Sequence, residues 1–237
     1  MRSLRKYLII LAFATLGVVV YFLAPPSRTV IRLTPSLELQ NDIETFSDSG
    51  VTGKSWVRMK HKDSPIEAEL YLDAPAEKNS WAGFGWLLRE SNWSFMDTLY
   101  VEVRAQGFDE LQFKILTFDP DHTDRKNRSS YRQLNKEIPV SREWQTICIP
   151  TNDFYIPDWW YKQQGVDPIL NSKHLESVYR LDVQPSEQAA RFVPLQLEIR
   201  SMTAVGASSR NTAILLGYLF ILMITTLGTN PNKRSSQ

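Results

Sequence analysis

The chain has 237 residues, enough for one domain of ordinary size with attachments. Its 27 lysine and arginine residues nearly balance 26 aspartate and glutamate residues, so the formal net charge is only +1. All acidic residues lie between two uncharged apolar runs, beside 22 of the basic ones, which gives this middle region a net charge of −4. An acidic middle region argues against a nucleic-acid-binding protein.

The first apolar run covers residues 7–24 and reads YLIILAFATLGVVVYFLA. Its length is close to the roughly 20 residues that a helix needs to cross a bilayer. The run ends in Ala24-Pro25-Pro26 and lacks a small-x-small cleavage site, so we expect a membrane helix that is retained, not a cleaved signal peptide. Residues 25–48 then form a lead-in with no assigned structure.

The second apolar run lies within residues 212–229 and reads TAILLGYLFILMITTLG, again without a charge. Arg2, Arg5 and Lys6 precede the first run, and Lys233 and Arg234 follow the second. The excess of basic residues on the cytoplasmic side places residues 1–6 and 230–237 in the cytoplasm and the middle region outside it. The sequence thus predicts an integral membrane protein, most simply of a bacterial inner membrane, with a periplasm-facing domain.

Residues 49–203 are predicted to form an extracytoplasmic β-sandwich, and residues 204–211 a short linker. Residues 56–62 and 66–73 alternate apolar and polar positions around the turn Asp63-Ser64-Pro65, which predicts a hairpin. Further strands are expected at residues 98–104, 110–118, 131–140, 144–150, 178–184 and 195–202. Many short strands and no convincing helix indicate an all-β, antiparallel sandwich. Trp144 is expected to be a core anchor, and Cys148 a buried thiol.

One segment, residues 152–170, is unusually aromatic for a loop and includes the run Asp158-Trp159-Trp160-Tyr161. Large apolar side chains in a loop either plug the end of a core or are displayed to a ligand. If the chain is extended there, adjacent rings point in opposite directions, so one tryptophan would be buried and the other exposed. We take Trp159, Trp160 and Tyr161 as candidate stacking platforms for a sugar ring.

Polar partners for such a ligand are expected on the strand at residues 178–184. Arg180 and Asp182 lie there opposite the apolar face formed by Tyr179, Leu181 and Val183. Arginine and carboxylate side chains can make bidentate contacts to neighbouring hydroxyl groups. Trp81 and Trp86 in WAGFGW are further candidate ligand contacts.

Neither catalysis nor a cofactor is predicted. The three histidines match no zinc spacing, and no serine has a recognisable base partner. A glycosidase needs only two carboxylates about 5–10 Å apart, and the sequence singles out no such pair. We therefore expect no catalytic residues, no metal site and no cofactor.

Several segments together resemble the galactose-binding-like jelly roll of carbohydrate-binding modules. They are WAGFGW, MDTLYVEVRAQG, LQFKI, WQTICIPTNDF and LQLEIRSM, which begin at residues 81, 96, 111, 144 and 195. The two apolar runs make the arrangement similar to the outer half of bacterial membrane sensors, although the residues after 228 are too few for an output domain.

The resemblance implies a membrane-tethered module that binds a glycan or a glycan-bearing envelope component. The alternative is a protein-interaction or sensory module in an envelope complex, because exposed tryptophan, tyrosine and arginine also dominate protein interfaces. In that case a signalling or assembly partner in the membrane would carry the output.

Overall fold

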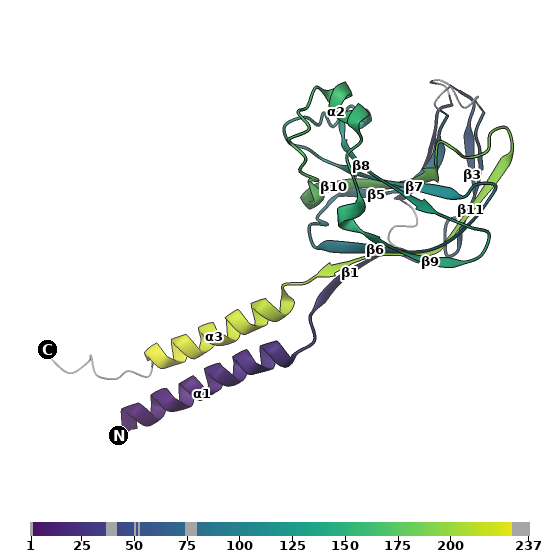
Figure 1. Cartoon of the computed structure of the whole chain (residues 1–237). Helices are drawn as coiled ribbons and strands as arrows, with labels where there is room; N and C mark the ends of the chain where they lie inside the picture. Colours follow the sequence, from purple (N-terminus) through teal and green to yellow (C-terminus); the bar gives the residue numbers. More distant parts are fainter. Residues whose placement is uncertain (1, 37–41, 50, 52, 74–79, 229–237) are drawn as a thin grey trace. The chain divides into compact units, whose positions relative to one another are not determined.

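The computed structural model describes residues 2–36, 42–49, 51, 53–73 and 80–228. The chain divides into two compact units, of which one comprises Met1–Thr29 with Ala207–Gln237 and the other Val30–Gly206. The first unit contains two long helices and the second contains the strands (Figure 1).

The unit Val30–Gly206 consists of two β-sheets, and every strand pairing with a described register is antiparallel. One sheet has the order β3-β4-β11-β6-β9, with β1 also paired to β11, and the other has the order β2-β5-β10-β7-β8. The first sheet contains β1 (Arg28–Thr34), β3 (Trp56–His61), β4 (Ile66–Tyr71), β6 (Met96–Gln106), β9 (Gln145–Pro150) and β11 (Pro194–Ala207). The second contains β2 (Ile43–Ser47), β5 (Ala82–Ser91), β7 (Glu110–Thr117), β8 (Arg132–Pro139) and β10 (Val178–Pro185).

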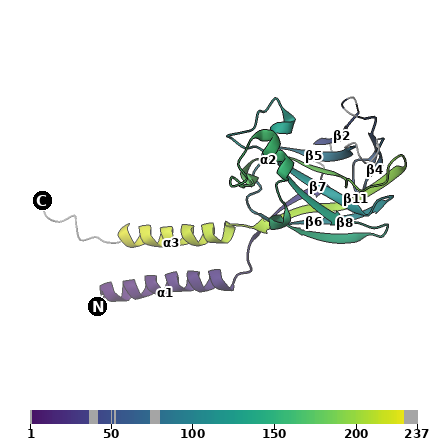
Figure 2. The ribbon, with the colours of Figure 1, turned by 45° about the horizontal axis from the view of Figure 1, so that its top comes forward.

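The two sheets face each other and enclose one hydrophobic core (Figure 2). Alternate positions supply it, because successive side chains of a strand point to opposite faces of the sheet. The first sheet contributes Leu99, Val101 and Val103 of β6, and the second contributes Phe84 and Trp86 of β5, all fully buried. This arrangement confirms the predicted antiparallel β-sandwich.

Strands in which apolar and polar residues alternate were predicted at the correct positions, whereas elements without that alternation were not predicted. The predicted hairpin is present as β3 and β4, and Lys60 on β3 forms an ion pair with Glu69 on β4 at 3.4 Å. The lead-in contains the strands β1 and β2, which the sequence did not predict. A short helix, α2 (Asp158–Gln164), lies within the aromatic segment, and single 3-10 turns occupy Arg128–Ser130, Thr151–Asp153 and Leu175–Ser177.

Two side chains expected in the core lie on the outer face of the first sheet. Cys148 is exposed, so the prediction of a buried thiol is wrong. Trp144 is half-buried and has the guanidinium carbons of Arg200 at 4.0 Å and Arg104 at 4.8 Å from its ring centre. It is held by cation–π contacts and not by burial in the core, contrary to the expectation.

The other unit contains α1 (Arg2–Leu23) and α3 (Arg210–Gly228). Tyr218 of α3 donates a hydrogen bond to the Phe13 carbonyl of α1 at 2.8 Å, and Tyr21 and Thr212 share a second one at 3.1 Å. Gly17 permits the close approach, because a Cβ atom at that position would overlap the Tyr218 ring. The two helices therefore pack against each other.

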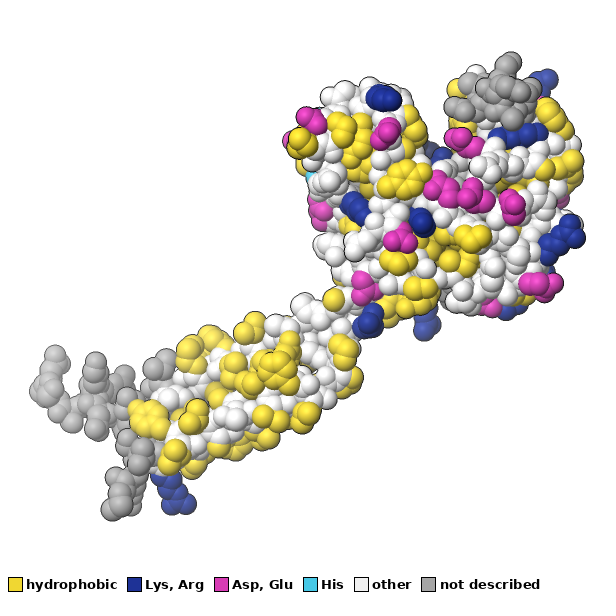
Figure 3. Space-filling model, in the orientation of Figure 1, with side chains coloured by type: hydrophobic (Ala, Val, Ile, Leu, Met, Phe, Trp, Pro, Cys, Tyr) yellow, Lys and Arg dark blue, Asp and Glu magenta, His cyan; other side chains and the backbone are white. Residues whose placement is uncertain are grey.

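Large apolar side chains remain exposed along both helices, among them Leu11, Phe13 and Phe22 of α1 and Leu216 and Phe220 of α3. Figure 3 shows apolar side chains over much of the visible face of the two helices, interspersed with other groups. Among the described residues, no helix combines the length and hydrophobicity required of a membrane span. The structure thus contains helices where two spans were expected but does not support the spans themselves.

Candidate functional site

The three aromatic platforms predicted in residues 159–161 have different surroundings. Trp159 is 46% exposed, whereas Trp160 is fully buried and Tyr161 is nearly so. The indole nitrogen of Trp160 donates to the Tyr131 carbonyl at 2.8 Å, and Trp160, Tyr161 and Val166 form a small apolar cluster. Trp160 and Tyr161 therefore cannot stack on a ligand as predicted, and Trp159 alone of the three remains available.

One tryptophan is buried and one exposed, but the physical cause differs from the one proposed. The pair lies in α2, where successive residues are rotated by about 100° around the helix axis, instead of alternating along an extended chain. Pro157 precedes the helix, and Gly165 ends it in the left-handed conformation at φ 66°. Proline before a helix and glycine after it are the usual boundary residues.

A buried arginine connects the aromatic segment to the sandwich. Arg132 of β8 is 1% exposed and donates to the carbonyls of Leu170 at 2.6 Å and Ser172 at 3.0 Å. It also forms an ion pair with Asp119, and its guanidinium carbon lies 4.9 Å from the centre of the Trp160 ring. Burial alone would raise the pKa of Asp119, but the hydrogen bonds and charge of Arg132 outweigh it and hold that pKa below its ordinary value.

The two tryptophans predicted in WAGFGW also separate. Trp86 is fully buried in the core on the inner face of β5, so it cannot contact a ligand. Trp81, just before β5, is half-buried, and its ring centre lies 6.2 Å from that of Phe46 on β2. Trp81 therefore remains a candidate contact and Trp86 does not.

Arg180 and Asp182 lie where the alternation of β10 placed them, on the outer face of the five-stranded sheet. The register aligns Asp182 with Gly85 of β5 and with Lys114 of β7, while Lys114 aligns with Asn135 of β8 and Gly85 with Glu44 of β2. A neighbouring row joins Gln184, Gln112 and Glu137 on β10, β7 and β8. We call this outer surface the polar face, formed by Glu44, Phe46, Glu110, Gln112, Lys114, Asn135, Glu137, Arg180, Asp182 and Gln184.

Two glycines make room for the polar face. A Cβ atom at Gly85 would overlap the Asp182 carboxylate and lie 2.5 Å from the Leu181 carbonyl. At Gly83 it would lie 2.7 Å from the Phe46 ring and 2.9 Å from Gln184 Cβ. Because β5 has no side chain at these positions, Arg180 can reach across that strand to β2.

Arg180 is the centre of the charged part of the polar face. It forms ion pairs with Asp182 and, at 2.8 Å, with Glu44, and its guanidinium carbon lies 5.3 Å from the centre of the Phe46 ring. Burial raises the pKa of Asp182 despite the opposing effect of Arg180 and Lys114, and burial lowers the pKa of Lys114 despite the nearby carboxylates. The protein thus holds charged groups in place that would be better solvated in water.

Amide side chains form the neighbouring part of the polar face. Gln184 donates to Gln112 at 3.0 Å, and Gln112 donates to Glu137 at 2.6 Å. The phenol of Tyr155 donates to both oxygens of Glu137 at 3.1 and 3.2 Å, and Tyr155 and Asn135 exchange two backbone hydrogen bonds. Tyr155 is therefore fixed beside the polar face with part of its ring exposed.

Most of the polar face was not predicted from the sequence, including Glu44, Lys114, Glu137 and the two glutamines. The alternation of residues 110–118 does put Gln112 and Lys114 on one side of their strand. That signal becomes useful only when β7 is known to lie beside β10. In Figure 3 the molecular surface is hollowed between the part that carries α2 and the part that carries β3, and acidic side chains gather there.

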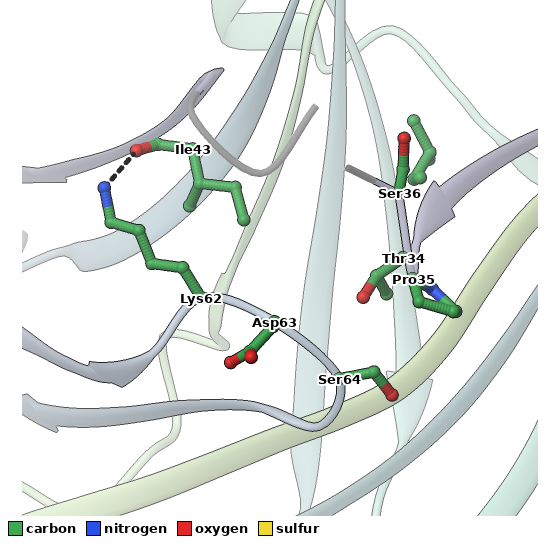
Figure 4. A pocket seen from close by; sticks show the side chains of 8 residues that line it. Thr34, Pro35, Ser36, Ile43, Lys62, Asp63 and Ser64 are labelled. Atoms are coloured by element: carbon green, nitrogen blue, oxygen red, sulfur yellow. Dashed lines mark hydrogen bonds between the residues drawn. The ribbon is translucent and has the colours of Figure 1, made fainter. Parts of the chain in front are cut away.

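A small pocket, separate from the polar face, lies among the end of β1, the start of β2 and the β3–β4 turn (Figure 4). It encloses about 120 Å³, and Lys62 at its side donates to the Ile43 carbonyl at 3.1 Å. Pockets for small organic ligands usually enclose roughly 300–1,000 Å³, so this one suits water better than a sugar. No cluster of three histidine, cysteine or acidic side chains within the described ranges is arranged to hold a metal ion.

Comparison with known proteins identifies the fold. No family model matches the chain, and no curated protein matches it either. The family 11 carbohydrate-binding module of the cellulosomal cellulase Lic26A-Cel5E of Clostridium thermocellum is similar in structure, with a TM-score of 0.52 and 14% identity over 78% of this chain and 97% of that chain. The family 11 module from Clostridium thermocellum in complex with a β-1,3-1,4-mixed-linked tetrasaccharide gives the same TM-score and identity over 78% and 98%. The β-sandwich of this chain therefore has the fold of these carbohydrate-binding modules.

Proposed function

We propose that the β-sandwich binds a glycan on the polar face and has no catalytic role. The observation that carries this proposal is the convergence of buried, mutually oriented polar side chains from four strands on one sheet surface. Arg180, Asp182 and Gln184 come from β10, and Lys114 comes from the adjacent strand. Burying polar groups costs free energy unless hydrogen bonds or ion pairs replace their contacts with water, so such a cluster is unusual without a function.

The chemistry of the polar face suits a sugar. Hydroxyl groups need donors and acceptors in fixed positions, and the C–H face of a sugar ring stacks on an aromatic ring. Phe46 and Trp81 lie at the β2 side of the polar face, and the partly exposed Tyr155 lies at the β8 side. The similarity of fold to carbohydrate-binding modules supports the same conclusion, since glycans are their ligands by description.

Replacing Lys114 by methionine should weaken glycan binding at least tenfold, which corresponds to about 1.4 kcal/mol. The change removes the amino group of Lys114 and keeps an unbranched, flexible side chain in its place. The free energy of unfolding should stay the same or increase, because burial already disfavours the charged form of Lys114. The full-length protein in detergent micelles would be screened on a glycan array, and affinity for the best ligand then measured by calorimetry.

Lys60→Met is the matched control, because Lys60 lies on β3 of the other sheet and is largely solvated. It should alter neither affinity nor stability by more than about 1 kcal/mol. Equal affinities of the Lys114→Met variant and the parent would place glycan binding away from the polar face.

We also propose that the helical unit holds the sandwich at a membrane, with residues 49–203 outside the cytoplasm and both chain ends inside it. Support comes from the uncharged runs, from the basic residues that flank them and from the exposed apolar side chains of α1 and α3. A contiguous apolar surface on a monomer larger than a few hundred Å² is unusual unless another apolar phase covers it. A bilayer supplies that phase.

The protein should therefore remain with membranes after extraction at high salt and at alkaline pH, and detergent should release it. A reporter joined after Gln237 should be active in the cytoplasm. Release by salt alone, or a reporter active only outside the cytoplasm, would refute the proposed placement.

A protein partner is a second candidate, favoured by exposed apolar side chains around α2. Trp159, Ile169 and Leu170 are all exposed there, and tryptophan is enriched in interface hot spots. The Trp159→Ala variant separates the two functions, because it should spare glycan binding if the polar face alone binds the sugar. If the Trp159→Ala variant no longer co-purifies with an envelope protein, while its binding to glycans is unchanged, the protein-interaction function is favoured.

A further inference from the structure

The orientation of the amide side chains on the polar face is set by a carboxylate. Glu137 can only accept hydrogen bonds when ionised, so Gln112 must direct its amide nitrogen to Glu137 and its oxygen to Gln184. Gln184 then donates through its own nitrogen. The relay therefore ends in an acceptor, Gln184 Oε1.

That acceptor is without a partner among the described residues, and so is Asn135 Oδ1 in the adjacent row. Gln184 is 5% exposed and Asn135 4% exposed, so bulk water does not readily replace the missing donors. Both buried oxygen atoms therefore lack a hydrogen-bond donor from the described part of the chain. A ligand that presents further acceptors, such as a carboxylate, would leave them unsatisfied and would repel Glu137.

Negative charge is concentrated at the same end of the polar face. Glu110 lies on the same side of β7 as Gln112, two residues away, and Glu187 follows β10. Burial, together with the charges of Glu137, Glu187 and Glu110, raises the pKa of the Tyr155 phenol to about 12. The charges of all three carboxylates thus act on the Tyr155 phenol, which contacts only Glu137 directly.

The bases available on the polar face do not neutralise this charge. Arg180 is paired with Glu44 and Asp182, and no ion pair within 4 Å reaches Glu110, Glu137 or Glu187 among the described residues. Burial disfavours the ammonium form of Lys114, and the Arg191 guanidinium donates to the backbone carbonyl of Glu187 and not to its carboxylate. A cation from outside the protein would be attracted to this end.

We propose that the Glu137 end of the polar face binds a protonated amine, so that the glycan ligand contains amino sugars with free amino groups. This inference rests on the proposed glycan-binding function and specifies its ligand. An ammonium group carries three donors, of which Glu137 can accept one, and its charge is opposite to that of Glu137, Glu110 and Glu187. Neighbouring hydroxyl groups of the same sugar would meet Arg180 and Asp182.

The test compares three β-1,4-linked tetrasaccharides of the same length, built from glucosamine, from N-acetylglucosamine and from glucose. Calorimetry with the full-length protein in detergent should give at least tenfold tighter binding of the glucosamine tetramer than of either other tetramer. N-acetylation removes the charge and keeps the sugar ring, so it is the critical comparison.

The Glu137→Gln variant should reduce this preference to within about threefold, because the charge is lost and the direction of the amide relay is no longer fixed. Glu67→Gln, on β4 of the other sheet, is the matched control and should keep the full preference. If both variants lose it equally, the attraction is a property of the whole acidic domain and the proposed amine site is wrong.

The remaining outcomes are also decisive. Equal or tighter binding of the N-acetylated or the glucose tetramer would overturn the amine inference and leave the glycan-binding function standing. Failure of all three tetramers and of every glycan on the array would overturn the proposed function, and the inference with it. The preference of the unmodified protein decides between these outcomes even if a variant does not fold.

Discussion

Replacing Arg132 by methionine should lower the free energy of unfolding by about 3–5 kcal/mol, the usual result of breaking a buried ion pair from one side. The change leaves the Asp119 carboxylate buried without its counter-charge and leaves the carbonyls of Leu170 and Ser172 without their donor. Urea denaturation followed by tryptophan fluorescence would measure the loss. Arg125→Met, which breaks a largely solvated pair with Glu90, should cost less than about 1 kcal/mol.

The same pair predicts how stability depends on pH. Because the pKa of Asp119 is lower in the folded state than in the unfolded chain, its contribution is complete above the unfolded value of about 3.9. It is lost as the pH falls through the lower, folded pKa. The parent should therefore lose stability below about pH 4 more steeply than the Arg132→Met variant. Parallel acid profiles would indicate that the pair contributes nothing.

Trp160→Ala should destabilise the protein by about 3–5 kcal/mol, as large-to-small changes at fully buried aromatic positions do. The variant removes a ring that fills the apolar cluster with Tyr161 and Val166, and it leaves the Tyr131 carbonyl without the indole donor. Trp159→Ala, its immediate neighbour, is the matched control and should shift the unfolding free energy by less than about 1 kcal/mol. If both changes destabilise the protein equally, then Trp160 is not buried while Trp159 is exposed, contrary to the structure.

Most strands could be predicted because one face packs on the core and the other carries polar side chains or glycine, which gives the sequence a period of two. The strands β1 and β2 were missed because their own sequences, RTVIRLT and IETFS, do not alternate clearly between apolar and polar residues. The helix α2 has only seven residues, too few for a helical period to be visible between prolines and glycine. For Cys148 the strand was predicted correctly but the side chain was assigned to the wrong face. The flanking isoleucines suggested burial, whereas the thiol lies on the outer face of β9.

Only the site residues that belong to one strand, β10, could be predicted from the sequence. Arg180 and Asp182 follow from alternation within β10. Lys114 and Glu137 lie beside them because β7 and β8 are neighbours of β10 in the sheet, although dozens of residues separate them in the chain. The role of Trp160 depended on the local backbone, because an extended chain and a helix orient adjacent side chains differently. Sheet order and local conformation are both tertiary information.

The backbone bridge between Asn135 and Tyr155 has a consequence for how the protein avoids self-association. The strand β8 is the last of its sheet, and an outermost strand exposes a row of N–H and C=O groups that can pair with another chain. Tyr155 occupies both groups of Asn135, at 2.7 and 3.0 Å, and so covers the middle of that edge. The contacts of Arg132 and Trp160 hold the rest of the aromatic segment in place beside it. Loosening this segment would thus uncover a template for edge-to-edge aggregation as well as weaken the fold.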